Sequence, residues 1–295
     1  MSTSLPTTTL MALIGCALMD KSKPAVSIGV PGIRTEAWEQ LADSIERTIT
    51  SHTFEIIFVG PFAPPESLLK RSYVKFIKDF GCPSRALQIS SVHASGTLFT
   101  WAVDDGVLNE GSLDDQLSFF LLYPPEDKKI LNLIYTEGEH YKWGADLRLI
   151  RPQDWYRPKF HDDFKSLEGV KDDWYTAILF VMRLEHFRDL GGIDCRFETI
   201  NYNLHDLSFR AQRDGFSLYF SDVRRPVHRI DWQDGSQRPE GEPIFEATFE
   251  NDKPLLDSIY STVENSFNRP ICIDYDHWKD IPDFWPRKWK EEHGS

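Results

Sequence analysis

An apolar run that ends on two adjacent carboxylates most constrains what this chain can fold into. Residues 96–103 are rich in β-branched and aromatic side chains, and Asp104 and Asp105 follow directly. Such a run predicts a buried strand. In an open α/β sheet, ligands bind at the carboxyl ends of the strands, and paired carboxylates at such a place suit a hard divalent cation that carries phosphate. The simpler alternative is a strand followed by an Asp-Gly turn.

The rest of the chain alternates between strand-like and helix-like patterns. Strands are predicted over residues 25–30, 54–59, 86–90, 97–103, 130–135, 177–182 and 216–220, and helices over 35–49, 66–79, 113–122, 204–214 and 255–267. This alternation predicts an α/β fold with a mainly parallel sheet and helices on both faces. With 295 residues, of which 41% are hydrophobic, the chain can bury a substantial core.

A second group of motifs lies about a hundred positions after the carboxylate pair. The segment 183–194 ends in Gly-Gly-Ile-Asp, residues 205–210 read His-Asp-Leu-Ser-Phe-Arg, and His228 follows. Together with the carboxylate pair, these motifs resemble the inverting family 2 glycosyltransferases, which have a GT-A fold. The resemblance covers about residues 24–230, and the order and spacing of the short motifs carry it.

The resemblance implies a domain organisation and an activity. It predicts a GT-A-like (Rossmann-like) domain over residues 1–230 and a C-terminal extension over residues 231–295 that packs on this domain. The implied reaction moves a sugar from a nucleotide-diphosphate donor to a hydroxyl of a glycan or other acceptor, with inversion and with Mn²⁺ or Mg²⁺. A UDP-sugar is the expected donor. The base stays open because Gly60-Pro61 stands where the family usually has an Asp for the uracil ring.

The resemblance also implies metal and donor ligands. Counting from Gly96 places Val103 at the first Asp of the family's DxD motif and Asp105 at the second, so Asp105 is expected to hold the metal. His228 is expected to be a third metal or diphosphate ligand, although a lone histidine equally fits a structural role. The residues expected to bind the donor are Pro31, Arg34, Arg85, Asp104 and Asp105.

An inverting transferase also needs a general base for the acceptor hydroxyl. The resemblance implies that Asp206 is this base. In the alternative interpretation, Asp206 is an N-cap or first-turn residue whose negative charge is stabilised by the helix dipole. Arg210, one turn later, can pair with Asp206 at i,i+4 or contact a phosphate. The residues expected to bind the acceptor are Trp174, Gly191, Gly192 and His205.

Composition limits the other functional classes. The formal net charge of −13 argues against general binding of nucleic acid or of anionic membranes. Four cysteines without a C-x-x-C pair argue against a zinc site, and a cytoplasmic setting is expected. The apolar stretch 10–19 is too short to span a bilayer, so no transmembrane segment is expected.

Two further functions stay open beside the transferase. A metal-dependent nucleotidyltransferase would also use paired carboxylates, but it does not explain the later motifs. A non-catalytic module that binds sugar or nucleotide on a degenerate GT-A fold fits the missing first Asp of the DxD motif. The aromatic C-terminal extension can cover the domain or form a homo-oligomer contact.

Overall fold

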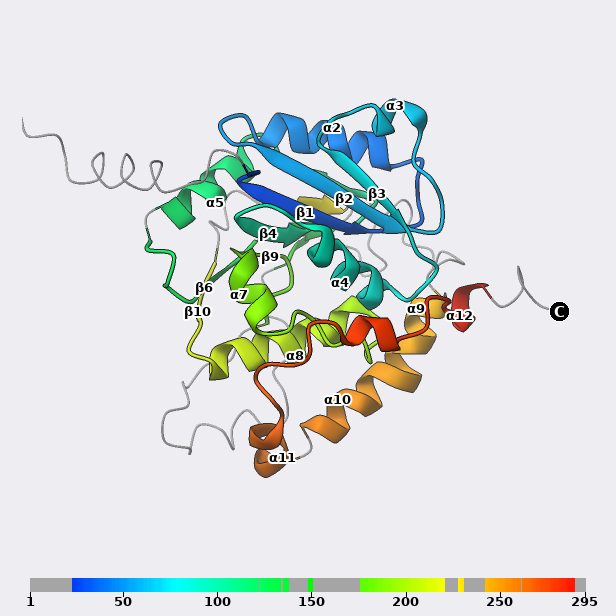
Figure 1. The fold of residues 1–295 in the computed structure, drawn as a ribbon, viewed down its shortest axis with the longest axis vertical. Helices are drawn as coiled ribbons and strands as arrows, with labels where there is room; N and C mark the ends of the chain where they lie inside the picture. The colour runs from blue at the N-terminus through cyan, green and yellow to red at the C-terminus, as the bar shows by residue number, and fades with distance from the viewer. Residues whose placement is uncertain are drawn as a thin grey trace, which may run out of the picture.

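A seven-stranded mixed sheet forms the centre of the molecule (Figure 1). The computed structural model describes residues 23–121, 123–133, 135–137, 148–150, 176–220, 228–230, 242–260 and 262–289. The strands of this sheet are β1 (Val26–Pro31), β2 (Phe54–Gly60), β3 (Val74–Lys78), β4 (Leu98–Trp101), β6 (Lys129–Asn132), β9 (Phe180–Arg183) and β10 (Ser217–Phe220). Their order is β10-β6-β9-β4-β1-β2-β3. Only β9 runs antiparallel to both of its neighbours, so the predicted α/β fold with a mainly parallel sheet is confirmed.

Helices cover both faces of this sheet (Figure 1). The helices before the C-terminal extension are α2 (Trp38–Thr48), α3 (Glu66–Leu69), α4 (Pro83–His93), α5 (Ser112–Leu121), α7 (Leu184–Asp189) and α8 (Ile200–Arg213). In Figure 1, α2 lies on one face, while α4, α7 and α8 lie on the other. The helix α2 forms because Trp38, Leu41 and Ile45 recur at helical spacing, and all three side chains are fully buried.

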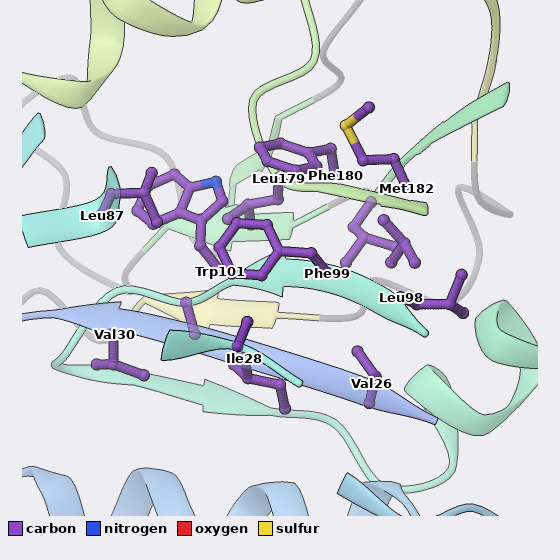
Figure 2. Close-up of a cluster of buried hydrophobic side chains, with 14 of the residues drawn as sticks. Val26, Ile28, Val30, Leu87, Leu98, Phe99, Trp101, Leu179, Phe180 and Met182 are labelled. Carbon is purple, nitrogen blue, oxygen red and sulfur yellow. The ribbon is translucent and has the colours of Figure 1, made fainter. Parts of the chain in front are cut away.

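The core between the sheet and its helices is built from alternating side chains. Figure 2 shows Val26, Ile28 and Val30 along β1, with Phe99 on the adjacent strand β4 and Phe180 on the next strand, β9. All five side chains are buried. A strand buried on both faces reads as a near-continuous apolar run, which is why β1, β2 and β4 were visible in the sequence.

A second, four-stranded sheet lies next to the carboxylate pair. It consists of β5 (Gly106–Leu108), β7 (Tyr135–Glu137), β8 (Arg148–Ile150) and β11 (His228–Ile230), in the order β5-β11-β7-β8. The strand β5 begins directly after Asp105 and pairs antiparallel with β11. This small sheet therefore brings the segment at 228–230 beside β5, which follows the carboxylate pair.

Two predicted elements were wrong. Residues 66–79 form the short helix α3 and then β3, because Tyr73, Val74, Phe76 and Ile77 favour a strand over a second half of the helix. Residues 86–90 belong to the helix α4 and not to a strand. The helix begins at Pro83, which suits the first helical position because its missing N–H has no partner there.

The described part of the C-terminal extension is helical and packs on α8 and α4. It comprises α9 (Glu242–Ala247), the π-helical turn η3 (Thr248–Asp252), α10 (Lys253–Ile259), α11 (Val263–Asn268), the 3₁₀ turn η4 (His277–Asp280) and α12 (Pro286–Trp289). The single helix predicted over 255–267 is thus two helices, and the Thr262 side chain caps the second by accepting the Asn265 N–H. Phe209 of α8 packs edge-on against Tyr260, with the ring centroids 4.7 Å apart.

None of the helices in the described ranges is long and apolar enough to cross a bilayer. The apolar stretch 10–19 lies outside these ranges. The division into a domain over 1–230 and an extension over 231–295 remains a prediction.

Candidate functional site

The strand order creates a switch point between β1 and β4. From β1 the chain moves to β2 and β3 on one side and then returns to β4 on the other. Ligands of open α/β sheets bind outside the carboxyl ends of the strands at such a point. Pro31, the last residue of β1, and Arg34 lie on one side of it, and Asp104 and Asp105 lie on the other. Four of the five expected donor residues therefore meet at this place.

Asp104 holds the loop that follows β1. Its Oδ2 accepts the backbone N–H groups of Ile33 and Arg34 at 2.8 and 2.9 Å, and its Oδ1 accepts Arg34 Nε at 2.9 Å and also Arg34 Nη2. A Cβ at Gly32 would collide with the Asp104 side chain, so the loop approaches the carboxylate with bare backbone. Since its oxygens are engaged in this way and the residue is buried, Asp104 fixes the geometry of the site.

Asp105 is the more accessible carboxylate of the pair. Its side chain is 13% exposed, and Oδ1 lies 3.1 Å from Arg34 Nη2. Two carboxylates and one guanidinium leave a net charge of −1, which favours a cation. Mg²⁺ commonly uses one or two carboxylates and completes its shell with substrate phosphates and water. A site in which Asp105 is the more accessible of two carboxylates fits this pattern. The described ranges contain no cluster of three or more His, Cys, Asp or Glu that could hold a metal.

His228 lies on the strand beside β5 but not opposite Asp105. The antiparallel register pairs His228 with Leu108, and Ile230 with Gly106. The backbone of His228 is therefore three residues further along the ladder than Asp105, about 10 Å at 3.4 Å per residue. Only the backbone of His228 is described, so its role as a ligand remains a prediction.

Asp206 has different surroundings from those expected of a general base. It lies in the middle of α8 and is fully buried. Oδ2 accepts Arg210 Nε at 2.8 Å, and Oδ1 accepts Arg269 Nε at 2.9 Å and the Tyr260 hydroxyl at 2.5 Å. A group in this position has no free oxygen to offer an acceptor hydroxyl. The geometry thus favours a structural role for Asp206.

The guanidinium groups around Asp206 determine its charge state. Burial alone would raise the pKa of Asp206, but the neighbouring Arg210 and Arg269 outweigh this effect and hold the pKa well below its usual range. Arg269 also contacts Asp194 at 2.6 Å. Arg210 forms the i,i+4 ion pair that the spacing predicts, and it donates to the backbone carbonyls of Leu190, Gly192 and Ile271. Arg210 thus links α8 to the C-terminal extension.

The two glycines expected at the acceptor site face other parts of the fold. Gly191 and Gly192 have φ values of 82° and 70°, which glycine adopts without strain. A Cβ at Gly191 would collide with the carbonyl of Ile273, and one at Gly192 would collide with the Gln88 side chain. Both glycines therefore allow the C-terminal extension and α4 to pack closely, and their role in binding an acceptor remains a prediction.

Arg85, expected to bind the donor, is occupied by contacts within the fold. Its Nε lies 3.1 Å from Oδ1 of Asp79, and its Nη1 donates to the carbonyls of Trp278 and Ile281, the latter at 2.9 Å. The guanidinium also lies over the Trp278 ring, 5.1 Å from its centroid. Arg85 is buried in this arrangement, which connects α4 to η4 and does not favour a role in donor binding.

His205 is buried beside the segment that precedes β9. Its Nδ1 lies 3.0 Å from Thr176 Oγ1. Burial lowers the pKa of His205 to about 4, so the ring is neutral at pH 7. Trp174, the other aromatic residue expected at the acceptor site, lies outside the described residues.

Several partners of the site residues were not predicted. Asp79 lies at the carboxyl end of β3 and would have been found by the signal that identified Asp104, if the strand had been predicted. Tyr260 and Arg269 carry no such signal, because their partner Asp206 is 54 and 63 residues away in the sequence. Pairings over such distances arise only when the helices pack.

Comparison with solved structures identifies the fold of this chain, whereas comparison of sequences finds no relative. A scan against protein-family models and a search of curated proteins find no match. Among solved structures, the chain is similar to GalNAc-T7 with UDP, GalNAc and Mn²⁺: 13% identity over 88% of this chain and 57% of that chain, with a TM-score of 0.52. This chain thus spans less than two thirds of that structure's length. The fold is that of the GT-A glycosyltransferases.

A second similarity supports the same fold. Two structures of TarS of S. aureus (residues 1–349), one of them in complex with UDP, are each 11% identical over 92% of this chain and 75% of that chain, with a TM-score of 0.50. The GT-A fold expected from the resemblance is therefore confirmed. At sequence identities of 11% and 13%, the similarity establishes the fold and not the activity.

Proposed function

We propose that this protein is a glycosyltransferase that moves a sugar from a nucleotide-diphosphate donor to an acceptor hydroxyl, with inversion. The observation that carries the proposal is the Asp104–Asp105 pair at the switch point between β1 and β4 of a GT-A sheet. UDP is bound in the structures of GalNAc-T7 and TarS, which supports a nucleoside diphosphate as part of the donor here. The acceptor we propose is a glycan or another hydroxyl compound.

In this proposal the two carboxylates have different roles: Asp105 binds the metal, and Asp104 positions the loop after β1. Asp105 would hold Mn²⁺ or Mg²⁺, which stabilises the negative charge that develops on the leaving diphosphate. GalNAc-T7, which has a similar fold, was solved with Mn²⁺. Asp104 orients the loop after β1 and with it the guanidinium of Arg34, which is 26% exposed and lies beside both carboxylates. This guanidinium can contact the diphosphate by charge-assisted hydrogen bonds.

We assign Asp206 to the stability of the fold instead of proton transfer. A general base must reach the proton that it accepts, directly or through one water. The carboxylate of Asp206 is enclosed by Tyr260, Arg210 and Arg269, and the two guanidinium groups disfavour its protonation. The side chain therefore matches a buried ion pair and not a proton acceptor.

The test of the proposed function measures donor turnover. The purified protein is incubated with Mn²⁺ and a panel of nucleotide sugars, and release of nucleoside diphosphate is followed with and without candidate acceptors. We expect release from at least one donor, loss of release in EDTA, and a product of inverted anomeric configuration by NMR. Binding of nucleoside diphosphate without any turnover would support a non-catalytic module, and turnover of nucleoside triphosphates alone would support a nucleotidyltransferase.

A further inference from the structure

The guanidinium of Arg34 bridges the two carboxylates of the site. Its Nη2 donates to Asp104 Oδ1 and lies 3.1 Å from Asp105 Oδ1, and its Nε donates to Asp104 Oδ1 at 2.9 Å. One nitrogen thus contacts an oxygen of each carboxylate. A positive charge in this position offsets the repulsion between the two neighbouring carboxylates, which is also what a divalent cation does between such groups. Arg34 is therefore a cation that the chain itself supplies to the site.

The two oxygens of Asp104 hold different parts of the loop after β1. Oδ2 accepts the backbone N–H groups of Ile33 and Arg34 at 2.8 and 2.9 Å, whereas Oδ1 accepts from the guanidinium. The backbone contacts therefore do not depend on where the Arg34 side chain points. This side chain is 26% exposed, compared with 3% for Asp104 and 13% for Asp105. The guanidinium is thus the most exposed of the three charged groups, and it can change its partner while the loop stays in place.

A divalent cation and the guanidinium compete for the same carboxylates. A cation that binds Asp105 comes close to Arg34 Nη2, since this nitrogen already contacts the Asp105 carboxylate, and like charges at such distances repel. A nucleoside diphosphate changes this balance. Its phosphate oxygens can accept hydrogen bonds from the guanidinium and coordinate a metal at the same time. The diphosphate therefore offers the guanidinium a new partner in place of the carboxylates.

We propose that Arg34 couples the binding of the metal to the binding of the donor: its guanidinium holds the cation position between Asp104 and Asp105 and moves to the diphosphate when metal and donor bind together. This inference rests on the proposed function, because it concerns the regulation of the same site. A divalent cation alone then binds weakly, and it binds tightly only together with a nucleoside diphosphate. Such coupling is reciprocal, so the metal and the diphosphate raise each other's affinity by the same factor.

The test measures the affinity for Mn²⁺ with and without nucleotide, from the electron paramagnetic resonance signal of free Mn²⁺. The full-length protein is compared with the variants Arg34→Gln, Arg34→Lys and Arg71→Gln, each alone, with UDP and with GDP. Arg71 is a matched control, because its side chain is 23% exposed and contacts two carboxylates, Asp43 at 2.6 Å and Glu46 at 3.7 Å. It precedes β3 and therefore lies at the end of the sheet opposite to the carboxylate pair.

In the unmodified protein, at least one of the two nucleotides should tighten Mn²⁺ binding by about tenfold to a hundredfold. Arg34→Gln removes the competing charge, so Mn²⁺ alone should bind at least about fivefold tighter, and the effect of the nucleotide on Mn²⁺ binding should shrink by a similar factor. Arg34→Lys keeps the charge, so its affinity for Mn²⁺ alone should stay within about threefold of that of the unmodified protein. Arg71→Gln should change neither quantity.

A nuclear magnetic resonance signal of Arg34 separates a change of partner from a general effect of charge. Arg34 Nε–H donates to Asp104 Oδ1, so its ¹⁵N–¹H resonance reports whether the guanidinium stays between the carboxylates. The resonance is assigned by its absence in Arg34→Gln or Arg34→Lys. Mg²⁺ and saturating nucleotide together should shift this resonance, whereas the same concentration of Mg²⁺ alone should leave it unchanged. Mg²⁺ replaces Mn²⁺ in this experiment because it is diamagnetic.

Failure of the inference is distinguishable from failure of the proposed function. The inference is overturned, while the proposed function stands, if Arg34→Gln binds Mn²⁺ alone no more tightly than the unmodified protein, if Arg71→Gln tightens it equally, or if the Arg34 resonance stays in place with metal and nucleotide together. If neither nucleotide binds in Mn²⁺ although the protein is folded, the proposed function fails and the inference fails with it. Should Arg34→Gln not fold, the resonance of the unmodified protein decides.

Discussion

At the residue scale, the surroundings of a carboxylate determine whether it can bind a ligand or take part in a reaction, or whether it only stabilises the fold. Asp105 is partly exposed and shares one guanidinium with its neighbour, whereas Asp206 is fully buried between two guanidinium groups and a phenol. A buried ion pair contributes little net stability, yet removing one partner leaves an uncompensated charge, which costs about 3–5 kcal/mol. The two residues should therefore respond to substitution in opposite ways.

The first prediction concerns Asp206→Asn. We expect the free energy of unfolding of this variant to be about 3–5 kcal/mol lower, because Arg210 loses its carboxylate partner and Arg269 keeps only Asp194. Its donor turnover per folded molecule should stay within about threefold of the unmodified protein, since a group outside the site does not lower the reaction barrier. Chemical denaturation and single-turnover assays measure the two quantities.

Asp214→Asn is the matched control for this prediction. Asp214 follows the same helix and pairs with Lys128 at 2.8 Å, but both side chains are substantially exposed. Loss of such a surface pair should cost less than about 1 kcal/mol. A stable Asp206→Asn protein that turns over a hundredfold more slowly would restore Asp206 as the general base.

The second prediction separates Asp105 from Asp104. Asp105→Ala should abolish the Mn²⁺-dependent part of nucleoside diphosphate binding, because Asp105 is the more accessible carboxylate of the pair and lies beside the guanidinium of Arg34. Asp104→Ala should lower the melting temperature instead, since the N–H groups of Ile33 and Arg34 lose their acceptor. Calorimetry with and without EDTA measures the first effect, and thermal unfolding measures the second.

Glu110→Gln serves as the control for both variants, because Glu110 is exposed and follows β5. It should bind nucleotide and melt like the unmodified protein. If Asp104→Ala alone removed the response to Mn²⁺, the metal ligand would be Asp104 and the position counted from Gly96 would be off by one.

The third prediction concerns pH and His205. The pKa of His205 is lowered from 6.5 to about 4 by burial, so between these values the unfolded chain binds a proton that the folded chain does not. Stability must then fall as the pH is lowered through this window, by about 3 kcal/mol in total for a shift of this size. His205→Gln should lose this contribution, so the difference between the two unfolding free energies should change between pH 7 and pH 4. A difference that stays constant over that range would show that His205 titrates normally.

At the element scale, most of the sheet could be predicted from the sequence because its central strands are buried on both faces. The runs of β1, β2 and β4 are mostly apolar, and helix α2 shows a clear helical repeat. The edge strand β3 contains Lys75 and Lys78 among its apolar residues. Because these lysines are three residues apart, the same pattern also fits the polar face of a helix. The failure at β3 then carried over to α4, because a strand was assigned where the following helix lies.

The candidate site was predictable only in part, for a related reason. Asp104 and Asp105 could be assigned to the site because the end of a strand is visible in the local sequence, and ligands of open α/β sheets bind at the carboxyl ends of the strands. The partners of Asp206 could not, because Tyr260 and Arg269 come from the C-terminal helices. The sequence of residues 205–210 resembles a catalytic segment. The sequence alone does not show whether the Asp206 side chain is exposed to solvent or buried against an arginine.

On the scale of the whole molecule, the C-terminal extension joins the sheet domain through buried contacts. Its Arg269 pairs with Asp194 and Asp206, and Trp285 donates its backbone N–H to Phe80 at 2.8 Å. Arg85 of α4 also donates to the carbonyls of Trp278 and Ile281 in the extension. Because these contacts are buried and come from several parts of the extension, we expect the extension to unfold together with the sheet.

The last prediction tests this unity by truncation. A chain ending at residue 241 keeps Asp194 and Asp206 but loses Arg269 and Tyr260, and it uncovers the apolar side chains of Phe197, before α8, and Phe209, on α8. Asp206 keeps Arg210 and Asp194 keeps Arg196, but both lose Arg269, and the aromatic side chains lose their cover. Together these losses should cost several kcal/mol, while a whole domain is stable by only about 5–15 kcal/mol. We therefore expect the truncated chain to show no cooperative unfolding transition by near-UV circular dichroism and to be digested rapidly by trypsin. A truncated chain that melts cooperatively would instead make residues 1–230 an independent domain and reduce the extension to an accessory layer.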